Sequence, residues 1–168
     1  MKVLVAALAV AAAIPASAQS AWDLGKKVVG KGATATVEKQ VNKKLLEESR
    51  KNQCSFKTDS DQLEKGCDAK ARRLANALVD AKRKLAASGV KNFKFEVSGH
   101  TDSSGSAAHN KELSRKRAEA IKRELEKKGV PADEIVAVGE GADRPLVKPD
   151  DTPAKKAKNR RYEIRVRL

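Results

Sequence analysis

Two charged residues of this 168-residue chain could bind a ligand together because of their types and their spacing. Asp102 lies in a polar turn bracketed by Gly99 and Gly105, and Arg117 lies in the helix predicted to follow. A four-residue spacing places this arginine in an otherwise apolar stripe, which consists of Leu113, Arg117, Ile121 and Leu125. A guanidinium beside a core is costly unless it has a partner, and Asp102 is the nearest candidate.

Two interpretations of this pair remain open from the spacing alone. In the first, Asp102 and Arg117 form an internal ion pair that fixes the turn, as structural pairs commonly do. In the second, both face a zwitterionic ligand, so that the carboxylate takes an ammonium group and the guanidinium fork takes a carboxylate. The two are compatible, because a pair in the free protein can open to admit a ligand.

A strand, a turn and a helix must position these side chains. Alternation of apolar and polar residues predicts a half-buried strand over residues 92–98, with inward side chains at Phe93, Phe95 and Val97. Glycine in the turn permits close approach of a ligand, and Ser106 is the expected N-cap of the helix. Gly129 is expected to end that helix.

Several short motifs follow one another along the chain, namely Gly99-His100-Thr101-Asp102, Asn110, Leu113-Ser114, Arg117-Ala118 and Asn159-Arg160-Arg161. In kind and in order, these motifs resemble those of the OmpA-like peptidoglycan-binding domain. The resemblance covers roughly Cys54 to Leu168, and it is specific because several separated motifs keep the right order. It departs at Lys155-Lys156, where the family usually has a Gly-Arg pair, so no contact of that arginine is carried over.

The resemblance implies non-catalytic binding of peptidoglycan. In the family, the residues that match Asp102 and Arg117 hold the diaminopimelate residue of the stem peptide, which offers an ammonium and a carboxylate. By the same resemblance, Asn110 and the turn at Ser104 add hydrogen bonds, and Arg161 contributes at the pocket edge. The alternative is a structural or adaptor protein of the envelope, which binds lipid or protein through its basic surface and its N-terminal helix.

The chain is expected to have three parts. Residues 1–18 have the features of a signal peptide, namely an early lysine, a short apolar run and a small-residue cleavage pattern. Residues 19–52 predict an amphipathic helical segment, whose regular spacing starts near Thr36 after several glycines. Residues 53–168 form the OmpA-like domain. Export predicts a periplasmic location, free or at the outer membrane, with no transmembrane segment in the mature chain.

The composition limits the kinds of partner and cofactor that we expect the protein to bind. The formal net charge of +14 suits an anionic partner such as peptidoglycan, and other envelope proteins are further candidates. Nucleic acid is not expected, because aromatic residues that could stack on bases make up only 3% of the chain. His100 and His109 are the only histidines and lack further ligands, so we expect no metal or other cofactor. The sequence contains no oxyanion-hole motif and no nucleophile elbow, so we do not expect the protein to be an enzyme.

The two cysteines, Cys54 and Cys67, predict one disulfide because the chain is expected to be exported. The loop that this bond closes is short. In the chain-entropy view, such a bond contributes about 3 kcal/mol to the free energy of unfolding.

The expected fold is an α/β (α+β) sandwich with the order β-α-β-α-β-β and with helices packed on a mixed sheet. Its first strand is expected around Phe56, and a helix is expected over residues 68–87. After the central strand and helix, a short strand follows at residues 135–138. A loop then runs to about Lys158, and the last strand covers residues 162–168.

Overall fold

The structure is a computed structural model that describes residues 16–168, with side chains described from Thr34 onward. The larger compact unit of the chain runs from Thr34 to Leu168. The predicted signal peptide, residues 1–18, lies outside the described residues except for its last three, so its cleavage stays a prediction. Within residues 16–168, no helix combines the length and the apolar character that crossing a membrane requires.

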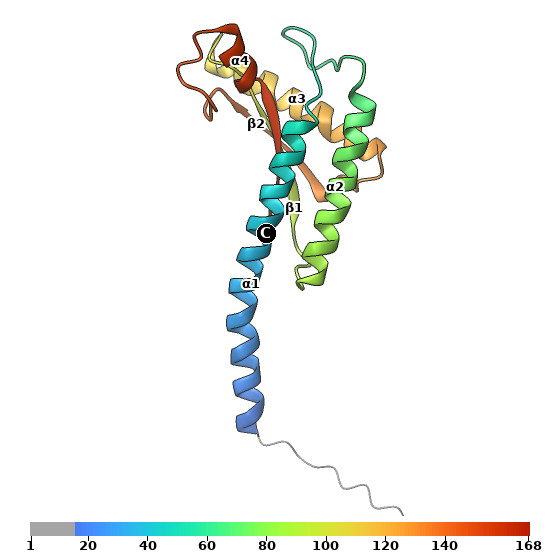
Figure 1. The fold of residues 1–168 in the computed structure, drawn as a ribbon, viewed down its shortest axis with the longest axis vertical. Coiled ribbons are helices and arrows are strands. Elements are labelled where there is room, and N and C mark those ends of the chain that lie inside the picture. Colours follow the sequence, from blue (N-terminus) through green and yellow to red (C-terminus); the bar gives the residue numbers. More distant parts are fainter. Residues whose placement is uncertain (1–15) are drawn as a thin grey trace, which may run out of the picture. The chain divides into compact units, whose positions relative to one another are not determined.

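A three-stranded mixed sheet forms the centre of the larger unit (Figure 1). Its strands lie in the order β2-β1-β3 and comprise β1 (Lys94–His100), β2 (Ile135–Gly141) and β3 (Arg161–Arg167). Strand β1 runs parallel to β2 and antiparallel to β3. Phe95 is paired with Ile135 on one side and with Val166 on the other, so apolar side chains of all three strands share one face.

Helices supply the rest of the core. They are α1 (Ala16–Lys51), α2 (Cys67–Ala87), α3 (Ala107–Lys127) and α4 (Pro153–Asn159), and a single 3-10 turn, η1, covers Ala132–Glu134. Leu78 and Leu85 of α2 are buried in the same cluster as Ile121 and Leu125 of α3 and the strand side chains. The expected α/β sandwich, with helices packed on a mixed sheet, is confirmed.

Two glycines allow α3 to lie directly on the strands. A Cβ atom at Gly99 would be 2.2 Å from the backbone oxygen of Ser114, and one at Gly139 would be 2.4 Å from that of Lys111. Any other residue at either position would push the helix away from β1 and β2. The distance between the end of β1 and Arg117 therefore depends on these two glycines.

Two expected features differ in the structure. The strand expected around Phe56 does not form, because Phe56 makes only an isolated bridge with Leu63. The loop expected to run to Lys158 instead contains α4, whose N-cap Thr152 accepts a hydrogen bond from the N–H of Lys155. A threonine followed by a proline is a recognised helix start, so the sequence does contain a signal for this helix.

Side-chain amides occupy the outer edge of β3. Asn42 of α1 accepts from the N–H of Val166 at 2.7 Å and donates to its carbonyl at 3.3 Å. Gln53 makes the same pair of bonds to Tyr162, at 3.1 and 2.8 Å. These amides satisfy backbone groups that an edge strand otherwise leaves open, so the outer edge of β3 offers fewer open groups to a further strand.

Helix α1 is longer than the sequence predicts, and its C-terminal part belongs to the core. It begins at Ala16 rather than near Thr36. Val41 and Leu45 are each 2% exposed and belong to the same cluster as the strand side chains. Because the compact unit begins at Thr34, the later part of the 19–52 segment folds together with the domain.

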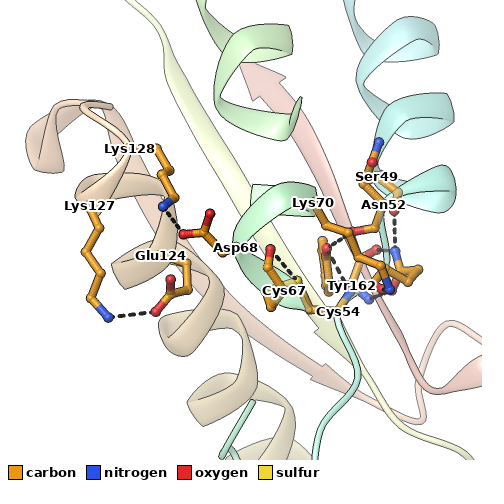
Figure 2. Close-up of a disulfide and its surroundings, with 11 residues drawn as sticks. Ser49, Asn52, Cys54, Cys67, Asp68, Lys70, Glu124, Lys127, Lys128 and Tyr162 are labelled. Carbon is orange, nitrogen blue, oxygen red and sulfur yellow. Dashed lines mark hydrogen bonds and ion pairs between the residues drawn. A yellow bond between two sulfur atoms is a disulfide. The ribbon is translucent and has the colours of Figure 1, made fainter. Parts of the chain in front are cut away.

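A disulfide joins Cys54 to Cys67, as the two cysteines predict (Figure 2). It closes a segment that we call the disulfide loop, residues 54–67, and both cysteines are buried. The hydroxyl of Tyr162 donates to the carbonyl of Asn52 and accepts from the N–H of Cys54 at 3.2 Å. The disulfide loop therefore starts against β3 and ends at the first turn of α2.

Candidate functional site

A cleft of about 750 Å³ lies at the carboxyl end of β1. Its walls come from the disulfide loop, the turn after β1, the first half of α3, and the junction of α4 with β3. All five residues predicted to bind a ligand line this cleft, namely Asp102, Ser104, Asn110, Arg117 and Arg161. The fold thus brings the predicted site together, and the contact of each residue with a ligand stays a prediction.

Asp102 is paired with Arg160 and not with Arg117. Its Oδ2 atom accepts from Nη1 of Arg160 at 2.7 Å, and its Oδ1 atom accepts from the backbone N–H of Ser104 at 2.9 Å. Burial raises the pKa of Asp102, but the hydrogen bonds from Arg160 and Ser104 outweigh burial and hold the pKa below its usual value. The interpretation that Asp102 forms an internal ion pair with Arg117 was therefore wrong, because the basic partner of Asp102 is Arg160.

Arg117 is half-buried and is held by the disulfide loop. Its Nε donates to the carbonyl of Ser60 at 2.9 Å, and its Nη2 donates to the carbonyl of Lys57 at 3.5 Å. The guanidinium also lies over the ring of Phe56, with its central carbon 5.1 Å from the ring centroid. Among the described residues Nη1 has no hydrogen-bond partner, so the outer end of the guanidinium fork remains available.

Positive charge prevails in the wall of the cleft. Apart from the two histidines, its charged side chains are Lys57, Asp59, Asp102, Arg117, Arg160 and Arg161. Burial lowers the pKa of Arg117, and the charge of Arg160 adds to that effect. An arginine nevertheless stays protonated throughout the physiological range, so the cleft suits a zwitterion or an anion.

The turn between β1 and α3 is held in shape by its own hydrogen bonds. Ser106 caps α3, as predicted, and Gly105 before it has a φ of +86°. The amide of Asn110 donates to the carbonyl of Ser104 at 2.8 Å. Lys156, from α4, donates to the hydroxyl of Ser104 at 2.8 Å. Asn110 and Ser104 thus belong to a turn that is already ordered, and their contacts with a ligand stay a prediction.

Arg161 lines the cleft, but its guanidinium is committed to the sheet. Its Nε donates to Glu163 at 2.9 Å, and the two side chains are 8% and 4% exposed. Its remaining nitrogens donate to two backbone carbonyls. Arg160 is therefore the arginine of the Asn-Arg-Arg motif that faces Asp102. The motif draws attention to both arginines equally. Because the side chains of adjacent residues point in different directions, only the fold shows which arginine faces Asp102.

Asp150 fastens the segment before α4 to the turn, although the sequence reasoning did not single it out. Its carboxylate accepts from the hydroxyl and the N–H of Ser103 and from the amide of Asn159, the last at 3.0 Å. These bonds, above all that from the Ser103 hydroxyl, lower the pKa of Asp150 to about 2. A single aspartate in a loop is common, so the sequence around Asp150 does not indicate that it fastens two loops together.

We expect Asp150→Asn to lower the melting temperature at neutral pH, because it removes the charge that these donors stabilise. A depressed pKa stabilises the fold above the ordinary value of 3.8, and this stabilisation is lost as the pH falls through about 2. The difference from wild type should therefore be largest at neutral pH and shrink at acidic pH. Thermal melts followed by circular dichroism measure it, and Asp151→Asn, at an exposed neighbour, is the control. A difference that does not change with pH would contradict this role.

Comparison with known proteins identifies relatives of the chain. Residues 55–160 match the sequence model of the OmpA family. Outer membrane porin F of Pseudomonas fluorescens is 49% identical over 71 residues, which are 42% of this chain and 22% of the porin. The peptidoglycan-binding protein ArfA of Mycobacterium bovis is 41% identical over 71 residues, with the same two coverages. The chain thus spans about a fifth of the length of these relatives.

A solved structure has the same fold. The peptidoglycan-associated lipoprotein from Burkholderia pseudomallei superposes with a TM-score of 0.56 at 26% identity. The similarity covers 68% of this chain and 89% of that protein. It therefore extends over most of the compact unit that contains the cleft.

Proposed function

We propose that this chain, which belongs to the OmpA family, binds peptidoglycan without cleaving it and so becomes linked to the cell wall. The names of its relatives support the proposal. ArfA is a peptidoglycan-binding protein, and the similar Burkholderia protein is a peptidoglycan-associated lipoprotein. The location that goes with this function is the periplasm, and the similarity to an outer membrane porin favours a place near the outer membrane.

The proposed ligand group is the diaminopimelate of the stem peptide, whose free end carries an ammonium and a carboxylate. Asp102 takes the ammonium, and the outer end of the Arg117 guanidinium takes the carboxylate. In the free protein Arg160 neutralises Asp102. Because the side chain of Arg160 is 45% exposed, it can move aside or share the carboxylate with little loss of stability.

One observation carries this proposal: Asp102 and Arg117 face one cleft, and each is held by contacts that leave part of its bonding capacity unused. The Asp102 carboxylate accepts two bonds and has further lone pairs. The loop carbonyls engage Nε and Nη2 of Arg117, and Nη1 is left for the ligand. Both side chains are oriented before a ligand arrives, which reduces the ordering cost of binding.

Retention by purified sacculi tests the proposal. The full chain should sediment with sacculi that contain diaminopimelate, and free meso-diaminopimelate should release it. Retention without release would support peptidoglycan binding and reject the diaminopimelate assignment. Salt-sensitive binding to anionic phospholipid vesicles, with no retention by sacculi, would instead favour an envelope adaptor that acts through its net charge of +14.

A further inference from the structure

The wall of the cleft carries more positive charge than the diaminopimelate end of a ligand can match. Its cations are Lys57, Arg117, Arg160 and Arg161, against the two carboxylates of Asp59 and Asp102. Even when Arg161 is set aside, because Glu163 neutralises it, the cations outnumber the carboxylates. A group with one ammonium and one carboxylate leaves this surplus unchanged, since its own charges cancel. The cleft therefore suits a ligand that carries a further negative charge.

Lys156 adds another cation at the edge of the cleft. It lies on α4 beside Ala157, which lines the cleft, and its Nζ donates to the hydroxyl of Ser104 at 2.8 Å. The backbone N–H of the same serine donates to the carboxylate of Asp102 at 2.9 Å. One serine thus contacts both Lys156 and Asp102, so this ammonium stands next to the proposed site of the diaminopimelate end.

No carboxylate of the described residues neutralises Lys156. The bond to Ser104 is the one hydrogen bond that its ammonium makes within this part of the chain. The preceding residue, Lys155, is instead paired with Asp151 at 2.7 Å. Because a lysine ammonium has three donors, two of those of Lys156 remain for a ligand.

The backbone that carries Lys156 is fastened to the turn that carries Asp102. Asp150 accepts from the N–H of Ser103 at 2.9 Å and from the amide of Asn159, the last residue of α4, at 3.0 Å. The N–H of Lys156 donates to the carbonyl of Thr152 at 2.9 Å, within α4 and its cap. The ammonium is therefore positioned at the edge of the cleft before a ligand arrives.

We propose that Lys156 binds a second carboxylate of the ligand, in addition to the one that Arg117 takes. This inference rests on the proposed function and names the stem peptides that the site prefers. The glutamate of the stem is linked through its side chain, so it keeps a free α-carboxylate directly before the diaminopimelate. The carboxylate at the end of the peptide is the other source. The glutamate group is the expected occupant, and its conversion to an amide should weaken binding.

Titration calorimetry on the full chain tests this preference. The probes are free meso-diaminopimelate, the stem tripeptide that ends in diaminopimelate, the same tripeptide amidated at the glutamate carboxylate, and the same tripeptide amidated at its C-terminus. We expect wild-type protein to bind the unmodified tripeptide about three- to tenfold more tightly than the form amidated at glutamate. Amidation at the C-terminus should change the affinity little.

Three variants identify the cation that is responsible. Lys156→Gln should bind the unmodified tripeptide and the form amidated at glutamate equally well, and it should bind free diaminopimelate as wild type does. Lys156→Arg keeps the cation and should keep the preference. Lys155→Gln removes the same charge from a neighbour that already has a partner, so it should also keep the preference. All three should melt close to wild type, since Lys156 has no ion pair to lose.

The outcomes separate this subsite from the proposed function. Wild-type protein that binds all three tripeptides equally would overturn the subsite. So would a full preference in Lys156→Gln, its loss in Lys155→Gln, or an equal loss of free diaminopimelate binding in Lys156→Gln. A preference that depends on Lys156 but concerns the C-terminal carboxylate would support the subsite with the other occupant. Wild-type protein that binds neither the tripeptide nor sacculi would overturn the proposed function itself.

Discussion

Arg117→Ala is expected to weaken binding to sacculi by about 2–5 kcal/mol, a loss of roughly tens- to thousands-fold, because the ligand carboxylate loses its charged partner. The same substitution should cost the fold only about 1 kcal/mol. The carbonyls of Ser60 and Lys57 that it releases lie in the disulfide loop, where water can replace the guanidinium. Quantitative sedimentation with sacculi and thermal melts measure the two effects.

Asp102→Ala is expected to reduce binding over the same range of about 2–5 kcal/mol, since the ligand ammonium loses its counter-charge. Its effect on stability should be about 1–2 kcal/mol. The substitution leaves the backbone N–H of Ser104 without its acceptor, while the partly exposed Arg160 can be hydrated. The difference between the two losses distinguishes a ligand site from a structural pair.

Arg115→Ala is the matched control for both substitutions. Arg115 lies on the same helix, but it is paired with Glu112 and Glu119 and is not among the residues that line the cleft. Its removal should leave binding to sacculi unchanged. Large losses of stability in Arg117→Ala and Asp102→Ala, with normal binding by the folded fraction, would reject the proposal that these two side chains hold the charged groups of the ligand.

A chain that begins at Asn52 is expected to lose most of its stability, whereas a chain that begins at Thr34 should fold. The shorter chain lacks Val41 and Leu45, two core side chains whose burial contributes about 3–6 kcal/mol together. It also lacks Asn42, whose amide closes the outer edge of β3. Such a loss is comparable to the whole free energy of unfolding of a typical domain, about 5–15 kcal/mol.

Thermal and urea unfolding of the two truncated chains measure this difference. Lys44→Ala in the chain that begins at Thr34 is the control, because Lys44 is on the same helix and its side chain is 60% exposed. That variant should unfold like its parent. Equal melting temperatures for chains that begin at Thr34 and Asn52 would show that α1 does not contribute to the core in the way its burial indicates.

The sequence by itself determined the features that depend on local physics. The alternation at Phe95 and Val97 predicts β1, and Ser106 predicts the start of α3, because side-chain periodicity and capping act within a few residues. The disulfide between Cys54 and Cys67 follows from the presence of two cysteines in a chain that is expected to be exported. The five residues that line the cleft were also singled out from the sequence, largely through the resemblance of their motifs to a known family, and their contact with a ligand stays a prediction.

Only the tertiary structure decided which groups meet in the cleft. Asp102 is paired with Arg160, which lies 58 residues away in the sequence, and Arg117 is held by backbone carbonyls of the disulfide loop. The amides of Asn42 and Gln53 bond to the outer edge of β3, although neither residue stands out in the sequence. Backbone carbonyls and N–H groups are the same at every position, so no residue type signals which of them a side chain will reach. That choice depends on how the loops and helices pack around the sheet.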